Sequence, residues 1–249
     1  MISSLRAYLI SDPLIIFATI FFGIISVFVS LFDKSGDTQI RLARVWARLL
    51  LWGSGIRVRV EGFEHIDPQG SYVFASNHLS YMDTPVVMAN LPMQFRFIAK
   101  SGLFKIPLLG THLGQAGHIP VHRGDPRASI KTMQTAADVI QKRGISMLIF
   151  PEGGRSHDGV LQPFKEGGAY IAIRAGVPLV PIALIGTDRV LPFGSGTPRT
   201  GRVTLRVFPP IETTSLTLKN RQELTERVRE LIVEALESGF SKNAPGRPV

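Results

Sequence analysis

Apolar residues recur along this chain with two different spacings, which predicts that helices and strands alternate. Short runs that are wholly apolar, or apolar at every second position, are typical of strands. Such strands are predicted at residues 56–60, 71–76, 95–99, 119–122, 145–150, 179–185 and 202–208. Apolar residues at helical spacing predict the helices. They are expected at 14–32, 38–51, up to about Asn90, 103–113 with breaks at Pro107 and Gly110, 125–144, 163–175 and 219–236.

Several of the predicted strands are almost entirely apolar, which is typical of strands buried on both faces. The expected fold class is therefore α/β, with a mostly buried mixed sheet covered by helices and a membrane-anchoring helical pair before it. The last strand, 202–208, alternates and is predicted to lie at an edge of the sheet. We expect membrane-associated helices over 1–55, the α/β domain over 56–240 and a flexible tail over 241–249.

The N-terminal helices have the composition of a membrane anchor. Residues 14–32 are 19 consecutive uncharged and mostly apolar positions, which is about the length that spans a bilayer core. Residues 38–51 form an amphipathic helix that carries Arg41, Arg44 and Arg48, which suit anionic headgroups. If the first helix spans, these arginines place the rest of the chain in the cytoplasm. The alternatives are insertion into one leaflet, a buried core helix, or a signal peptide, although no small-residue cleavage site follows.

Composition restricts the partners of this chain. The 249 residues are 45% hydrophobic and carry a net charge of +9, which favours a membrane surface, a nucleic acid or a phosphorylated substrate. Phenylalanine lies within apolar runs rather than among lysines and arginines, which argues against nucleic acid. The chain has no cysteine, which excludes disulfides, thiolate metal sites and a cysteine nucleophile.

A histidine and a carboxylate follow the predicted strand 71–76, in the segment from Asn77 to Asp83. A neutral imidazole accepts a proton near pH 7, and a carboxylate on its other nitrogen fixes the tautomer. If Ser80 caps the next helix, Asp83 leans back toward His78 and the two side chains meet. Pro85 favours a cap at Thr84 instead. The alternative interpretation is that Asp83 only caps the helix and that His78 lies on the surface.

A second polar loop follows the predicted strand 145–150. Glycines at 153 and 154 leave backbone amides uncovered for an anion, and Arg155 adds a forked cation suited to phosphate. This loop and the His78 loop both leave the carboxyl ends of buried strands, where open α/β sheets bind ligands. A solvated glycine turn is the alternative.

Other charged residues give weaker signals. Arg123 ends a short strand and is placed to reach the same crevice, although an isolated arginine is usually a surface residue. Lys105 flanks a turn and would add positive charge as a further substrate-binding candidate, with a solvated side chain as the alternative. The histidines lack the spacing of metal ligands, so no metal is expected.

Taken in order, these segments resemble the glycerolipid acyltransferases of the 1-acylglycerol-3-phosphate O-acyltransferase family. The likeness extends from about residue 56 to 210. The family's motifs correspond to Asn77-His78 with Asp83, Gly117 with Arg123, Phe150-Pro151-Glu152-Gly153 with Arg155-Ser156, and the proline-containing run 177–182. Phe164-Lys165-Glu166-Gly167 also looks like a frequent family element. Gly154 stands where the family usually has threonine, and Pro120-Val121 where it has Phe-Ile.

The resemblance implies transfer of a fatty acyl group from acyl-CoA or acyl-carrier protein to the sn-2 hydroxyl of lysophosphatidic acid. His78 would be the general base and Asp83 would orient it. Arg123, Glu152, Gly153 and Arg155 would bind the acceptor's glycerol phosphate. No metal or cofactor is implied. The expected location is the cytoplasmic face of a bacterial inner or plasma membrane.

Three alternatives remain open at this stage. A relative with the same reaction would use glycerol-3-phosphate, another lysophospholipid or a lyso-ornithine lipid as acceptor. A metal-dependent phospholipid hydrolase would also use histidine and aspartate, and its activity would depend on divalent ions. A non-catalytic membrane-binding module would need neither the His78–Asp83 pair nor Arg155.

Overall fold

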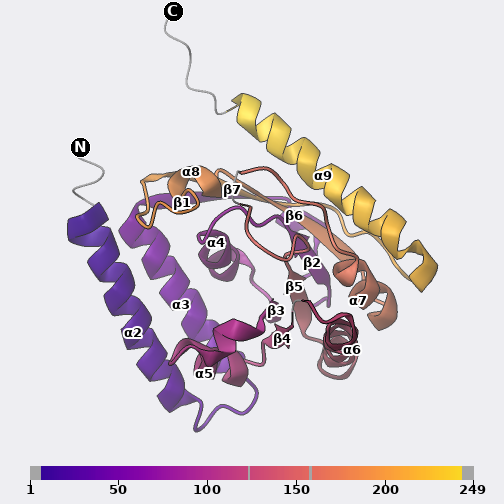
Figure 1. Cartoon of the computed structure of the whole chain (residues 1–249), viewed down its shortest axis with the longest axis horizontal. Coiled ribbons are helices and arrows are strands. Elements are labelled where there is room, and N and C mark those ends of the chain that lie inside the picture. Colours follow the sequence, from indigo (N-terminus) through magenta and orange to yellow (C-terminus); the bar gives the residue numbers. More distant parts are fainter. Residues whose placement is uncertain (1–6, 123, 157–158, 243–249) are drawn as a thin grey trace, which may run out of the picture.

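A mixed β-sheet forms the centre of the structure, a computed structural model that describes residues 7–122, 124–156 and 159–242. Its strand order is β1-β7-β6-β2-β5-β3-β4. All neighbours are parallel except β6 and β7, so the predicted mixed α/β sheet is confirmed (Figure 1). The strands are β1 (Ile56–Glu61), β2 (Val73–Ser76), β3 (Phe95–Lys100), β4 (Ile119–Val121), β5 (Ser146–Ile149), β6 (Leu179–Ile185) and β7 (Gly201–Val207).

Strand β7 is not an edge strand, so that prediction was wrong. It pairs with β1 on one side and β6 on the other, and the sheet ends at β1 and β4. Val203, Leu205 and Val207 are buried, whereas Arg202 is exposed on the opposite face. The alternating pattern therefore indicates that one face of β7 is not covered by helices. It does not show whether the strand has hydrogen-bonded neighbours on one side or on both.

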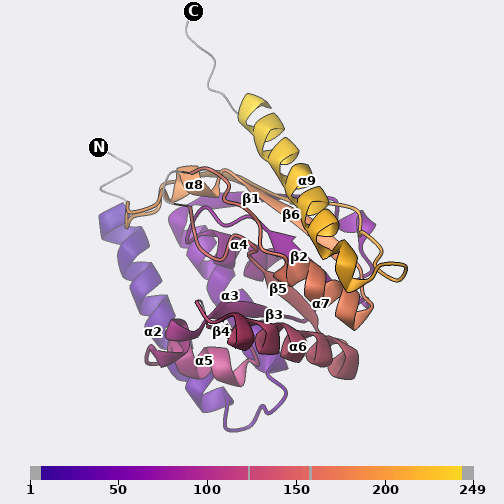
Figure 2. The same cartoon turned by 45° about the vertical axis from the view of Figure 1, so that its right-hand side comes forward.

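Helices cover the sheet on both faces, as Figures 1 and 2 show. The α-helices are α2 (Asp12–Val29), α3 (Asp37–Ser54), α4 (Asp83–Asn90), α5 (Leu109–Gln115), α6 (Pro126–Arg143), α7 (Gly167–Ala175), α8 (Thr187–Val190) and α9 (Arg221–Lys242). Short turns are the π-helical η1 (Ala7–Ser11) and the 3₁₀ segments η2 (Phe63–His65), η3 (Ser101–Lys105) and η4 (Leu218–Asn220).

Several helix boundaries differ from those predicted, among them those of α5, which begins at Leu109, α7 and α9. Helix α7 begins at Gly167 rather than at 163, because the preceding residues run as a loop against Pro151. Helix α9 continues to Lys242, beyond the predicted end at 236. Residues 243–249 of the predicted tail lie outside the described part of the chain.

The sheet separates two hydrophobic cores. One core joins α3 and α4 to the sheet, and the other joins α6, α7 and α9 to it. Along β2, Phe74 points into the first core, and Val73 and Ala75 point into the second. Leu148 and Met147 divide in the same way along β5. Because both faces are covered, these strands need apolar residues at every position.

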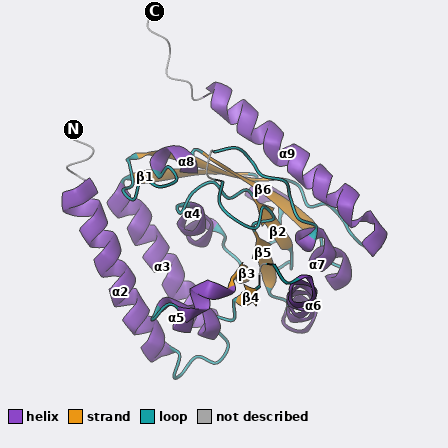
Figure 3. Ribbon diagram, viewed as in Figure 1, coloured by secondary structure: helices purple, strands orange, loops and turns teal. Residues whose placement is uncertain are grey.

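Helix α2 lies beside α3 at the outside of the molecule (Figure 3). The stretch Leu9–Val29 is long and apolar enough to cross a membrane, with a mean hydropathy of 2.3, and only 11% of its most apolar window is buried. Polar contacts attach one side of α2 to α3, where Ser26 Oγ donates to Gln39 Oε1 over 2.6 Å. The opposite side is apolar and exposed at Ile16, Phe17, Ile20, Phe21, Ile24 and Phe28.

Candidate active site

Two loops that leave neighbouring parallel strands form the candidate site. Strands β2 and β5 pair directly, so the loops after Ser76 and Ile149 emerge side by side at one edge of the sheet. The Ser156 amide donates to the His78 carbonyl over 3.2 Å and joins the loops. Asn77 attaches the first loop to β6, because its amide side chain bonds both backbone groups of Leu184 at 2.8–2.9 Å.

His78 and Asp83 are in contact, as their spacing predicted. His78 Nδ1 lies 2.8 Å from Asp83 Oδ2, which also accepts the Ser80 amide over 2.8 Å. A carboxylate only accepts, so Nδ1 carries the proton and the lone pair of Nε2 remains available. Asp83 is fully buried, whereas the His78 side chain is 17% exposed. The ring of His78 stacks on Phe150 with centroids 4.0 Å apart, which fixes its plane.

The predicted helix cap differs in detail. Helix α4 begins at Asp83, with Met82 rather than Ser80 in the N-cap position and no side-chain cap. Ser80 instead forms a turn ahead of the helix, where its hydroxyl accepts the Met82 amide and donates to the Leu191 carbonyl. The turn gives Asp83 the same backward reach toward His78 that the predicted cap required.

Glu152 connects three segments of the site. Its Oε1 accepts the His78 amide over 2.5 Å and its Oε2 accepts the Gln162 amide over 3.0 Å. Burial raises the pKa of the Glu152 carboxyl to about 7, despite these two hydrogen bonds and with a further rise from Asp83. Because Oε1 and Oε2 each accept a backbone amide, both oxygens of Glu152 position the loops.

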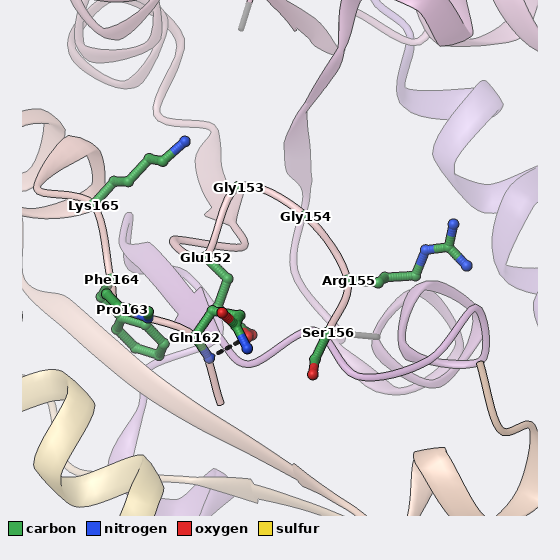
Figure 4. A pocket seen from close by; sticks show the side chains of 9 residues that line it. All are labelled: Glu152, Gly153, Gly154, Arg155, Ser156, Gln162, Pro163, Phe164 and Lys165. Atoms are coloured by element: carbon green, nitrogen blue, oxygen red, sulfur yellow. Dashed lines mark hydrogen bonds between the residues drawn. The ribbon is translucent and has the colours of Figure 1, made fainter. Parts of the chain in front are cut away.

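A pocket of about 630 Å³ opens beside this loop (Figure 4). Gly153 has φ +73°, and an added Cβ would lie 2.8 Å from Lys165 Nζ, so glycine lets the ammonium approach the backbone. Within the described residues no carboxylate forms an ion pair with Lys165. The pocket is lined by Glu152, Gly153, Gly154, Arg155, Ser156, Gln162, Pro163, Phe164 and Lys165.

Arg155 also lines this pocket, but its side chain extends away from Lys165 on the other side of the loop (Figure 4). Its guanidinium carbon lies 3.2 Å from the centroid of the Tyr81 ring and 5.2 Å from that of Phe193. Tyr81 belongs to the His78 loop, so this cation–π contact connects the two loops as well.

The remaining predicted site residues are not joined to this cluster. Arg123 lies outside the described residues. Lys105 is exposed at the end of η3. Within the described residues, no hydrogen bond or ion pair joins it to either loop. Across the described ranges, no group of three or more histidine and carboxylate residues is arranged to hold a metal.

Sequence reasoning missed two residues of the site. Lys165 lies in the Phe164–Gly167 element, which was noticed without being given a role. Asn77 was treated only as part of a motif, although it is fully buried and holds the histidine loop to β6. Their neighbours belong to distant segments, so only the family likeness could have indicated them.

Comparisons with known proteins point to one family. A protein-family model described as "Acyltransferase" matches residues 57–185. The 1-acyl-sn-glycerol-3-phosphate acyltransferase of Limnanthes douglasii is 33% identical over 202 residues, which cover 80% of this chain and 71% of that protein. The chloroplastic 1-acyl-sn-glycerol-3-phosphate acyltransferase BAT2 of Brassica napus is 35% identical over 187 residues, which cover 74% of this chain and 54% of that protein.

A solved structure gives the same result for the whole fold. The crystal structure of the 1-acyl-sn-glycerophosphate (LPA) acyltransferase PlsC from Thermotoga maritima superimposes with a TM-score of 0.79 and 25% identity. The match covers 98% of this chain and all of that chain, including the N-terminal helices. The chain therefore belongs to the 1-acyl-sn-glycerol-3-phosphate acyltransferase family and is an O-acyltransferase.

Proposed function

We propose that this protein transfers a fatty acyl group from acyl-CoA or acyl-carrier protein to the sn-2 hydroxyl of lysophosphatidic acid, giving phosphatidic acid. One observation carries the proposal: the His78–Asp83 pair, at 2.8 Å, lies beside an open glycine loop at the sheet edge. The names of the relatives from Limnanthes and Brassica support this acceptor.

In the proposed mechanism, His78 Nε2 takes the proton of the acceptor hydroxyl as that oxygen attacks the thioester carbonyl carbon. Asp83 holds the Nδ1 proton and stabilises the imidazolium that forms. Collapse of the tetrahedral intermediate breaks the carbon–sulfur bond, and the imidazolium returns its proton to the leaving thiolate. General base catalysis of this kind contributes about 10²–10⁴-fold.

The acceptor's phosphate is proposed to bind in the pocket over Gly153 and Gly154. Lys165 supplies a positive charge there that forms no ion pair with a carboxylate of the described residues, and Arg155 supplies a second charge on the other side of the loop. Arg123, which lies outside the described residues, is proposed to bind the same phosphate, as the family resemblance implies. Glu152 is better suited to positioning than to binding, because its two oxygens already accept backbone amides and a carboxylate repels phosphate.

Membrane attachment through α2 would give the enzyme access to lipid substrates in the bilayer and would let the lipid product leave into the same bilayer. Helix α2 is attached along α3, where Trp46 Nε1 donates to Thr19 Oγ1 over 3.2 Å and Ser11 Oγ to the Gly53 carbonyl over 3.0 Å. Helix α3 is itself part of the core through Ile40. An upright spanning α2 would draw the domain into the bilayer, so insertion of its exposed face into one leaflet, on the cytoplasmic side, is favoured.

The test uses purified protein in nanodiscs with labelled acyl-CoA or acyl-carrier protein. Lysophosphatidic acid, other lysophospholipids, a lyso-ornithine lipid and glycerol-3-phosphate are offered in separate reactions. We expect phosphatidic acid from lysophosphatidic acid, and loss of this product in His78→Ala. Preference for another acceptor would change the substrate assignment, and turnover that persists in His78→Ala would remove the proposed base. A requirement for divalent ions would favour the hydrolase alternative.

A further inference from the structure

A second pocket, of about 530 Å³, lies where strands β1 and β7 begin. It contains Arg57, Arg202, the indole of Trp52 and the backbone at Gly55 and Gly201. We propose that this pocket binds the phosphate of an anionic phospholipid headgroup in the bilayer that receives α2. The proposal relies on the membrane attachment argued above and is independent of the acceptor and of the His78 mechanism.

The charges in this pocket favour an anion. Arg57 and Arg202 are register partners in the parallel β1–β7 pair, so their side chains stand next to each other on one face. Glu61 forms ion pairs with Arg59 at 3.0 Å and Arg206 at 2.8 Å, farther along the same face. Among the described residues no carboxylate pairs with Arg57 or Arg202. Two adjacent guanidinium groups repel each other, and a phosphate between them would relieve that repulsion.

The position of the pocket fits a lipid headgroup. Ser11 donates to the Gly53 carbonyl, which places the start of α2 against the end of α3 next to the pocket. Leu9 and Ile10 are exposed there, and Trp52 is 74% exposed. Figures 1 and 2 place the start of β1 at this end of the helical pair. Apolar side chains with an indole and arginines at their border are typical of a membrane interface.

The pocket also opens on the edge of the sheet that carries the active site. Strand β7 runs antiparallel to β6, so its first residues lie at the carboxyl ends of β6 and β2. Because β6 alone separates β7 from β2, the start of β7 is displaced from β2 by two strand spacings, about 10 Å across the sheet. A headgroup held here would keep the catalytic edge at the level of the other headgroups, where a lysophospholipid presents its hydroxyl.

Sedimentation with vesicles tests the proposal. The probes are phosphatidylcholine vesicles, alone or with about 30% phosphatidylglycerol, mixed with the full-length protein. We expect Arg57→Gln/Arg202→Gln to lower the partition coefficient for the anionic vesicles about 30-fold, which is about 1 kcal/mol per arginine. Binding to phosphatidylcholine alone should stay unchanged. The matched control is Lys219→Gln/Arg227→Gln, which removes two exposed charges near the start of α9, on the side of the molecule away from α2 (Figure 1).

An equal loss of binding to anionic vesicles in the double variant and the control would show that only the net charge of the protein matters. This result would overturn the proposed site. Unchanged binding in the double variant would overturn it as well. A second measurement uses Trp46→Phe, which leaves Trp52 as the single tryptophan. Brominated phosphatidylglycerol should quench Trp52 fluorescence more strongly than brominated phosphatidylcholine at equal bromine content. Equal quenching by the two lipids would contradict selective headgroup binding.

Discussion

Single side chains hold the loops of the candidate site by bonding to backbone groups. Asn77 bonds to Leu184 and Asp83 bonds to Ser80, so the ring of His78 is fixed from both sides of its own loop. Gly153 then leaves room for Lys165 above the neighbouring loop. Because each of these residues acts on a specific partner, conservative substitutions can distinguish a change in geometry from a change in charge.

Asp83→Asn tests the orientation of the histidine. An amide in place of the carboxylate neither holds the Nδ1 proton nor balances the imidazolium, so we expect kcat to fall about 10²–10⁴-fold with little change in KM. Ser80→Ala is the control, because it removes the bonds to Met82 and Leu191 but keeps the His78–Asp83 contact. A similar fall in both variants would show that the loop matters rather than the carboxylate.

Gly153→Ala tests the pocket over the glycine loop. Gly153 and Gly159 have nearly the same backbone, with φ +73° and +76°, but an added Cβ meets Lys165 only at Gly153. Both alanine variants should lose about 1 kcal/mol of stability, because alanine is strained at positive φ. Only Gly153→Ala should raise KM for the lysophospholipid, and Lys165→Met should raise it about tenfold. A rise in the donor's KM instead would move Lys165 to the donor site.

At the scale of elements, the site depends on two neighbouring parallel strands, β2 and β5, whose carboxyl ends are in register. The loop after β5 is long, and Glu152 fastens it to the loop after β2 and to Gln162 before α7. A single buried carboxyl therefore sets the separation of three segments. Its protonation should be visible in the stability of the whole domain.

The free energy of unfolding should depend on pH through Glu152. Its pKa is about 7 when folded, against an ordinary value of 4.5, so the folded state binds more protons between these values. This contribution to stability is present below about pH 4.5 and is lost as the pH rises through about 7. Glu152→Gln removes it, so the variant should become more stable relative to wild type between about pH 5 and 8.

Denaturant unfolding of both proteins across this range gives the measurement. Burial lowers the pKa of His112 to about 4 and that of His118 well below its usual value. These histidines add stability as the pH rises, which opposes the effect of Glu152. The difference between variant and wild type cancels the histidine contribution, and a difference that does not change with pH would contradict the assignment.

At the scale of the whole molecule, the helical pair gives the enzyme one apolar side. Phe17 and Phe21 stack with centroids 5.7 Å apart and are 65% and 47% exposed on α2. The basic pocket at β1 and β7 lies at the end of the same pair, on the edge of the sheet that holds His78. If both proposals hold, neighbouring surfaces set the attachment to a bilayer and the orientation of the candidate active site.

Phe17→Ser/Phe21→Ser should lower binding to phosphatidylcholine vesicles about 100-fold or more, because each phenylalanine contributes about 1.5–3 kcal/mol when fully buried in lipid. Turnover of micellar substrate should stay near the wild-type value, since these side chains are exposed on α2 and belong to neither loop of the candidate site. Ile130→Ser, which changes an exposed apolar residue on α6, is the control. Vesicle binding that survives the double change would exclude α2 as the anchor.

The sequence by itself determined the alternation of elements and the α/β class, because hydrophobic spacing is a local property of the chain. It left the His78–Asp83 contact as one of two interpretations. Its resemblance to a known family also indicated both loops of the candidate site. Only the tertiary structure decided that β7 lies inside the sheet, that Glu152 braces the loops, and that Lys165 stands over Gly153 while Arg155 stacks on Tyr81. These facts depend on pairing between segments far apart in the chain, and spacing along one segment does not encode which partner it meets.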